Sequence, residues 1–226
     1  MPVIWIIFGV FMLISWLISH QLKSRFKRYS QVPVNGNLSG KEVAEKMLHE
    51  TGVVGVKVLS VPGQLTDHYD PTKRTVNLSP EVYHGRHIAA AAVAAHECGH
   101  AVQHARAYAF LQMRSKLVPV VSFASKWVQW VLLAGILLLE SFPQLLLFGI
   151  ILFATTTLFS FITLPVEINA SARALSWLNN AGITNSYSHP KAKDALSWAA
   201  YTYVVAALAS LATLLYYIMI YMGRRD

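Results

Sequence analysis

The chain has 226 residues, of which 54% are hydrophobic and 13% charged, whereas roughly 25% of an average soluble chain is charged. This composition excludes an intrinsically disordered protein, which needs low hydrophobicity and a high net charge. The single cysteine, Cys98, excludes an internal disulfide framework and a metal site made of several thiolates. A net charge of +8 is compatible with nucleic-acid binding, but a mean hydropathy of +0.42 favours a membrane protein.

Four apolar segments have about the length needed to cross a bilayer core of ~30 Å. The first is followed directly by basic residues and lacks a small-x-small cleavage site, which favours a retained anchor over a signal peptide. The fourth has tyrosines near its ends, as in the aromatic belts of membrane interfaces. The segments are 3–19, 117–139, 145–166 and 198–222.

The basic residues indicate how these segments are oriented. Sixteen of the 19 Lys and Arg residues lie in 20–116 and 167–197, which fall on the same side if each apolar segment crosses once. The positive-inside rule places that side in the cytoplasm, although Arg224 and Arg225 lie at the opposite end. The basic charge therefore indicates topology and contact with membrane lipids, and no nucleic-acid partner is expected.

The region between the first two spans predicts a small α+β arrangement. Ser39 with Glu42 three residues later is a capping box at the start of a helix. Two β-branched runs predict strands separated by a turn, and we expect the second to offer its edge to an extended peptide. The predicted elements are a helix over 41–51, strands over 53–61 and 72–78, a turn over 67–71, a turn or short helix from 79, and a helix over about 88–110.

The last of these helices contains an HExxH motif, His96-Glu97-Cys98-Gly99-His100. Two histidines four residues apart lie one helical turn above each other, so both imidazoles can bind one ion. Glu97, next to the first histidine, can take a proton from water activated by that ion. The motif predicts a zinc site, and Cys98, which points away from both histidines, is predicted to serve packing.

A catalytic zinc ion usually has three protein ligands. His104 is excluded, because on a continuous helix it rises about 12 Å beyond His96. Glu140 lies in the outer turn between the second and third spans. Glu167 directly follows the third span on the same side as the histidines, so it is the predicted third ligand; a charge that only marks the membrane exit is the alternative.

Several runs of the chain together resemble the YugP-like neutral zinc metallopeptidases of bacterial membranes. The resemblance covers nearly the whole chain. The proteins of this family are similar in plan to HtpX and the CAAX prenyl proteases. The matching runs are LTDHYD (65–70), VNLSP (76–80), AAHECGHAVQH (94–104), LPVEINAS (164–171) and AAYTY (199–203).

The resemblance implies one zinc ion per chain, with Glu167 as the Glu of a Glu-x-x-Ala-Asp motif and thus the third ligand. Ser171 stands where those relatives have the Asp that orients a histidine, and Asn169 is the nearest polar substitute. His189 matches, weakly, a histidine that the relatives place near the substrate carbonyl. Arg173 is a further candidate for a transition-state or substrate contact, by pairing with Glu167 or by stabilising the oxyanion.

Three other residues, Asp67, His68 and Asp70, have the chemistry of metal or substrate ligands. Turn formation explains the aspartates equally well, because their side chains hydrogen-bond to nearby backbone amides. We favour the turn interpretation.

The sequence therefore predicts a mainly α, four-span helical membrane protein with a small α+β, gluzincin-type metallopeptidase domain. The predicted function is a zinc metalloendopeptidase of the bacterial plasma membrane with a cytoplasmic active site; the alternative is a zinc-binding, non-proteolytic scaffold or regulator of a partner protease. Peptide or protein substrates are expected, and membrane-protein partners or self-association are compatible with the spans. The predicted segments are 1–20 (first span), 21–116 (catalytic region), 117–166 (transmembrane hairpin), 167–197 (third-ligand helix and loop) and 198–226 (fourth span and tail).

Overall fold

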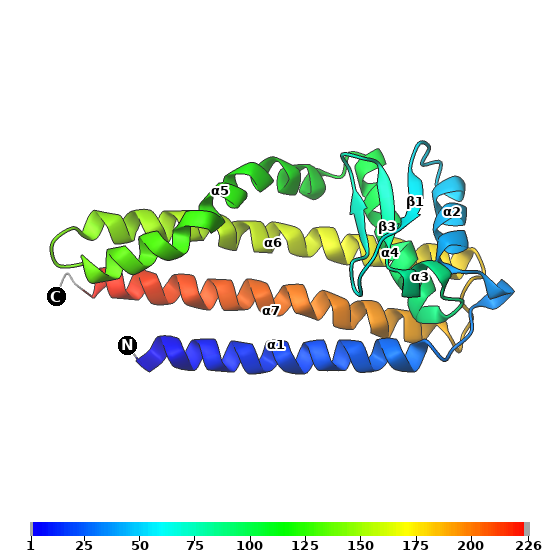
Figure 1. Cartoon of the computed structure of the whole chain (residues 1–226), viewed down its shortest axis with the longest axis horizontal. Helices are drawn as coiled ribbons and strands as arrows, with labels where there is room; N and C mark the ends of the chain where they lie inside the picture. Colours follow the sequence, from blue (N-terminus) through cyan, green and yellow to red (C-terminus); the bar gives the residue numbers. More distant parts are fainter. Residues whose placement is uncertain (1, 224–226) are drawn as a thin grey trace. The chain divides into compact units, whose positions relative to one another are not determined.

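The computed structural model describes residues 2–223, with side chains from residue 4, so Arg224 and Arg225 lie outside the described residues. The described chain is mainly helical with one small three-stranded sheet, which confirms the predicted fold class (Figure 1). Its elements are α1 (Pro2–Tyr29), η1 (Asn35–Asn37), α2 (Gly40–Glu50), β1 (Lys57–Ser60), β2 (His68–Asp70), β3 (Thr75–Leu78), α3 (Pro80–His84), α4 (Ile88–Ala105), α5 (Ala109–Leu137), α6 (Pro143–Asn180) and α7 (His189–Met222).

Four helices of the described chain, α1, α5, α6 and α7, are long and apolar enough to cross a membrane. They contain the four predicted apolar segments, except that the second extends two residues beyond the end of α5, and this confirms a multi-pass membrane protein. Helix α6 has 38 residues and continues well beyond its apolar part. Pro165 lies inside this helix and does not interrupt it.

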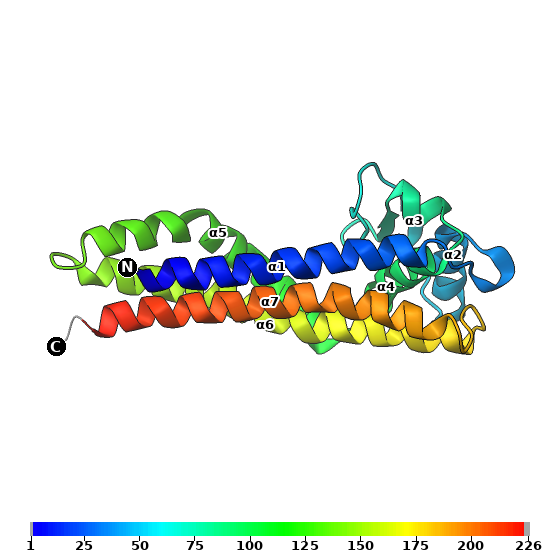
Figure 2. The same cartoon turned by 90° about the horizontal axis from the view of Figure 1, so that it is seen from below.

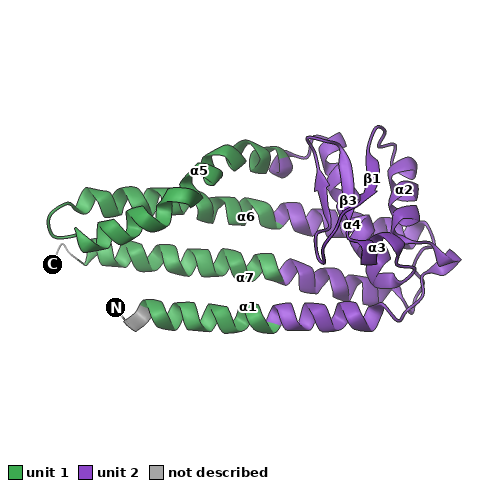
Figure 3. Ribbon diagram, in the orientation of Figure 1, with its two compact units in different colours: residues 1–17, 112–164, 202–226 green, residues 18–111, 165–201 purple. Residues whose placement is uncertain are grey.

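The chain divides into two compact units, each assembled from segments that are distant in sequence (Figure 3). Unit 1 contains the apolar parts of the four long helices, in residues 1–17, 112–164 and 202–226. Unit 2 contains residues 18–111 and 165–201, and with them α2, α3, α4 and the sheet.

In unit 1, α6 packs closely against its neighbours in the chain. A Cβ atom added at Gly135 of α5 would lie 2.6 Å from the Leu146 Cα of α6, so the two helices meet where only glycine fits. The hydroxyls of Thr157 and Ser210 hydrogen-bond at 2.7 Å and connect α6 to α7, which lie side by side in both views (Figures 1 and 2). The buried apolar core comprises Val128, Leu132, Leu146 and Ile150.

In unit 2, α4 is the central helix, and its small side chains let other elements approach closely. The alanine-rich run 89–95 is almost entirely buried, and α2, α3 and the sheet pack against this helix. Helix α2 begins at the predicted capping box: the Glu42 amide donates to Ser39 Oγ at 3.3 Å, and the Ser39 amide donates to Glu42 Oε2 at 2.7 Å.

The sheet has one strand more than predicted, and the prediction of a free edge for the second strand is not met. Residues 67–71, predicted as a turn, contain β2, which pairs antiparallel with β3 through registers such as Tyr69 with Val76. Since β1 pairs parallel with β3 on its other side, the order is β1-β3-β2. The expectation that the strand over 72–78 has a free edge is therefore wrong, because β3 is the central strand.

The motif helix is also shorter than predicted, since α4 ends at Ala105 and α5 begins at Ala109. The chain turns at Ala107, whose φ is 51°, and the Tyr108 amide donates back to the Gln103 carbonyl at 2.9 Å. The alanine-rich composition gave no indication of this left-handed residue, because alanine normally avoids positive φ.

Candidate metal centre

The start of α4 is fixed by a histidine that does not belong to the motif. His87 is the N-cap residue, and its Nδ1 accepts a hydrogen bond from the Ala90 amide at 3.1 Å. Burial lowers the pKa of His87, which keeps the imidazole uncharged and able to accept this bond. One of the amides that the first helical turn leaves without a partner is thereby satisfied.

The two ligand-bearing helices approach each other at Gly99. A Cβ atom added there would lie 2.6 Å from the carbonyl oxygen and 3.1 Å from the Cα of Ala170 in α6. Any side chain at position 99 would push α6 away, so glycine sets the spacing of the two helices. Since Ala170 is one turn beyond Glu167, this contact brings the carboxylate to the motif histidines.

Three potential ligand atoms converge between these helices, all of them in unit 2. The Nε2 atoms of His96 and His100 lie 3.3 Å and 3.5 Å from Oε2 of Glu167. One ligand atom from each residue lies within 4.8 Å of the other two. The predicted third ligand is thus brought to the two motif histidines, whereas His104 is turned to another partner and hydrogen-bonds the Tyr69 hydroxyl at 2.8 Å.

The spacing of these atoms fits a zinc ion. Ligand atoms bound tetrahedrally at zinc–nitrogen and zinc–oxygen distances of about 2.0–2.1 Å are separated by about 3.3 Å. The two observed distances to Glu167 agree with this separation. Two imidazoles and one carboxylate are a known catalytic donor set, which leaves a fourth position for water or substrate.

Each motif histidine is oriented through the nitrogen that faces away from Glu167. Nδ1 of His96 hydrogen-bonds the Ser171 hydroxyl at 3.0 Å, and Nδ1 of His100 hydrogen-bonds the Gln103 side-chain carbonyl at 3.1 Å. These contacts direct both Nε2 atoms to the shared position. Ser171 itself therefore orients His96, the role that the resemblance implies for an Asp at this position, whereas Asn169 does not contact this ring.

His100 combines deep burial with nearby negative charge. Desolvation alone would lower its pKa, but the hydrogen bond to Glu167 and the charges of Glu97 and Glu167 outweigh it, so the pKa of His100 is raised above 6.5. Without a metal ion, the nearby carboxylates therefore favour the protonated form of His100.

Glu97 is next to His96 in the motif and is only 8% exposed. Cys98 faces the opposite side of α4, where its thiol contacts the Ala44 carbonyl at 3.5 Å, and burial raises the pKa of this thiol well above its usual range. The predicted packing role of Cys98 is confirmed.

The two candidate substrate contacts have other partners in the structure. Nε of Arg173 donates to Oδ1 of Asn169 at 2.7 Å, and Nδ1 of His189, the first residue of α7, hydrogen-bonds the Thr184 hydroxyl at 2.9 Å. A contact of either residue with substrate stays a prediction.

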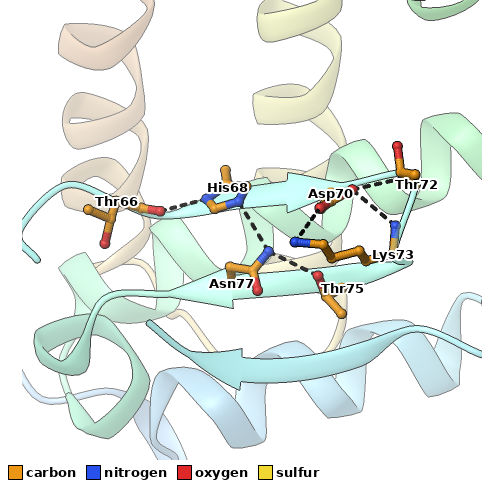
Figure 4. Close-up of polar contacts among 7 residues, drawn as sticks. All are labelled: Thr66, His68, Asp70, Thr72, Lys73, Thr75 and Asn77. Carbon is orange, nitrogen blue, oxygen red and sulfur yellow. Dashed lines mark hydrogen bonds and ion pairs between the residues drawn. The ribbon is translucent and has the colours of Figure 1, made fainter. Parts of the chain in front are cut away.

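Two of the three residues with ligand chemistry near β2, His68 and Asp70, have partners within the sheet and its turns (Figure 4). Asp70 accepts from the amides of Thr72 and Lys73, and these bonds lower its pKa. His68 donates from Nδ1 to the Thr66 carbonyl, and its Nε2 lies 3.2 Å from the Asn77 amide nitrogen.

Asp67 is turned toward the following segment, where it accepts hydrogen bonds from the amide and hydroxyl of Ser79. Burial raises the pKa of Asp67, although these bonds oppose the shift. The turn interpretation is therefore confirmed for Asp70, whose carboxylate accepts from amides two and three residues later, whereas Asp67 holds a segment twelve residues away in the chain.

Sequence reasoning missed Gln103, which is fully buried and contacts His100. The available signal was its position three residues after His100, because residues three apart share a helix face. A glutamine has no ligand chemistry of its own, so this spacing did not identify it.

The fold and the ligand geometry are those of a multi-pass membrane protein with a candidate zinc site. Residues 4–222 match the family described as "Putative neutral zinc metallopeptidase", and the chain belongs to this family. It is 44% identical over 213 residues to "Putative membrane protease YugP" of Bacillus subtilis (strain 168), and the match covers 94% of each chain. No solved structure matches the chain.

Replacing Gly99 by Ala should separate α4 from α6. Because the added Cβ overlaps the Ala170 carbonyl, we expect the distance from Glu167 to the histidines to increase and zinc affinity to fall about 10–100-fold. Competition of the purified protein with a fluorescent chelator measures this change. Gly9→Ala is the matched control, since a Cβ at Gly9 meets nothing within 4 Å. Wild-type affinity in Gly99→Ala would contradict the predicted role of this contact.

The raised pKa of His100 predicts a pH-dependent zinc affinity. Protons compete with zinc for Nε2, so affinity should fall as the pH drops through the raised pKa. The metal-free protein has the opposite dependence: the stability contributed by imidazolium is present at low pH and is lost as the pH rises through that pKa. The increase in melting temperature on adding zinc should therefore grow between about pH 6 and pH 8. An increase that is the same across this range would contradict the prediction.

Proposed function

We propose that this chain is a membrane-embedded zinc metalloendopeptidase that holds one zinc ion and hydrolyses peptide bonds. The observation that carries the proposal is the convergence of His96, His100 and Glu167 at zinc spacing, with Glu97 beside the first ligand. Membership of a zinc metallopeptidase family supports the same conclusion.

The residues of the chain divide the chemistry between them. His96, His100 and Glu167 would hold the ion, which when bound would polarise the substrate carbonyl and activate water. Glu97 takes the proton of the attacking water and then delivers it to the leaving amine nitrogen. Because Glu97 is largely buried, few solvent molecules compete for this proton.

The site is proposed to lie on the cytoplasmic face of a bacterial plasma membrane. Sixteen of 19 basic residues support this orientation, since they lie in the two segments that carry the ligands. Substrates would be peptides or proteins that reach this face, and His189 is the proposed contact to the substrate carbonyl. Membrane-protein partners or a second copy of the chain are compatible with the exposed apolar surfaces of the spans.

Glu97→Gln should separate catalysis from metal binding. The amide keeps the size of the side chain but cannot accept the proton, so we expect zinc to remain bound and cleavage of unfolded casein to fall about 10²–10⁴-fold. Chelation of zinc should abolish cleavage by the wild type, and readdition should restore it. Wild-type cleavage by Glu97→Gln would contradict the mechanism, while zinc binding without cleavage by the wild type would favour the non-proteolytic scaffold.

The orientation of the chain in the membrane can be tested by replacing one of two exposed serines with cysteine. Ser141 lies between α5 and α6, Ser186 lies between α6 and α7, and both are exposed. The native Cys98 is buried and gives little background labelling. A membrane-impermeant maleimide should label Ser141→Cys in intact cells and Ser186→Cys only after permeabilisation. The reverse pattern would place the site outside.

A further inference from the structure

We propose that Gln103, Asn169 and Arg173 form a hydrogen-bonded relay that positions His100 for zinc binding. The relay extends from a guanidinium in α6 to a motif imidazole in α4, and all its members lie in unit 2. This inference rests on the proposed function, because it concerns the same metal site. It gives Arg173 a role that differs from the substrate contact predicted from the sequence.

The relay starts at Arg173 because a guanidinium can only donate hydrogen bonds. Nε of Arg173 lies 2.7 Å from Asn169, so the atom that Asn169 presents there must be its carbonyl oxygen, Oδ1. This contact fixes the orientation of an amide group whose two ends are otherwise hard to distinguish. Asn169 therefore offers an acceptor to the next member.

The acceptor that Asn169 offers in turn fixes the orientation of the Gln103 side-chain amide. Its Nε2 donates to Asn169 Oδ1 at 3.0 Å and to the backbone carbonyl of Val166 at 2.8 Å. With both donor hydrogens used on α6, the remaining Oε1 faces His100 Nδ1 at 3.1 Å. Gln103 is fully buried, so no water is available to replace any of these partners.

The consequence for His100 is a defined tautomer. Since Gln103 Oε1 can only accept, Nδ1 of His100 carries a hydrogen in both the charged and the neutral ring, so in the neutral ring the lone pair is on Nε2. Nε2 is the atom that faces Glu167. The three side chains thus fix the orientation of the imidazole ring and the position of the hydrogen on Nδ1, as a metal ligand requires.

Two substitutions test the relay in the full-length protein purified in detergent. Gln103→Met keeps the side-chain volume but removes all three hydrogen bonds, and we expect a 10–100-fold loss of zinc affinity. Arg173→Met leaves the Val166 contact of Gln103 in place, so it should weaken zinc binding in the same direction but less. Since Arg173 is partly exposed, this second variant is expected to fold even if the first does not.

The matched control is Ser79→Ala, which removes a different buried hydrogen-bonding side chain from unit 2. It should bind zinc like the wild type. Zinc affinity is measured by chelator competition, and the absorption spectrum of the Co(II)-loaded protein reports the ligand geometry. Both relay variants should change the cobalt bands, whereas a merely structural effect would lower the melting temperature and leave these bands unchanged.

The outcomes separate this inference from the proposed function. Wild-type zinc affinity and cobalt spectrum in Gln103→Met would overturn the relay. Unchanged affinity with reduced turnover in Arg173→Met would make Arg173 a substrate contact and remove it from the relay. A wild-type protein that binds zinc but cleaves no peptide would contradict the proposed function alone. The zinc affinities of Gln103→Met and Arg173→Met, compared with that of the wild type, would still test the relay.

Discussion

The candidate centre depends on the close approach of α4 and α6 at Gly99 and Ala170. A single added methyl group would meet backbone atoms at 2.6 Å, and backbone cannot move aside as a flexible side chain can. At this spacing, side chains one turn from the contact, such as Glu167 and His96, come within the reach of one ion. The alanine-rich surface of α4 has the same effect elsewhere, since it allows α2, α3 and the sheet to surround the helix.

Close packing removes water, so the polar groups around the contact need partners within the protein. Ser171 and Gln103 meet this need for the two imidazoles, and Val166 and Asn169 meet it for Gln103. Partners drawn from both helices mean that the orientation of the ligands and the packing of the helices depend on each other. A change in one is therefore expected to disturb the other, as in the predicted effects at Gly99 and Gln103.

Features encoded over short distances along the chain could be predicted from the sequence. The capping box at Ser39, the spans and the HExxH turn each depend on residues within a few positions of one another. Glu167 was also identified, because the order of the spans limits which acidic residues lie on the side of the histidines. Its placement thus came from topology combined with the family resemblance.

The remaining features depend on contacts between distant segments or on unfavourable backbone conformations. Strand β2 has the composition of a turn and becomes a strand only by pairing with β3. The end of α4 requires a positive φ at Ala107, which alanine disfavours. Gln103 acquires a role only through groups of α6 that lie more than sixty positions away in the chain.

The identity of the groups behind the imidazoles also determines the charge of the site. Among the described residues, the partners at Nδ1 of His96 and His100 are a hydroxyl and an amide, neither of which carries charge. A carboxylate in such a position makes the histidine a more basic ligand. With uncharged partners, the negative charge among the three ligands comes from Glu167 alone. A divalent ion held there would keep a net positive charge, which is the property needed to polarise a carbonyl and activate water.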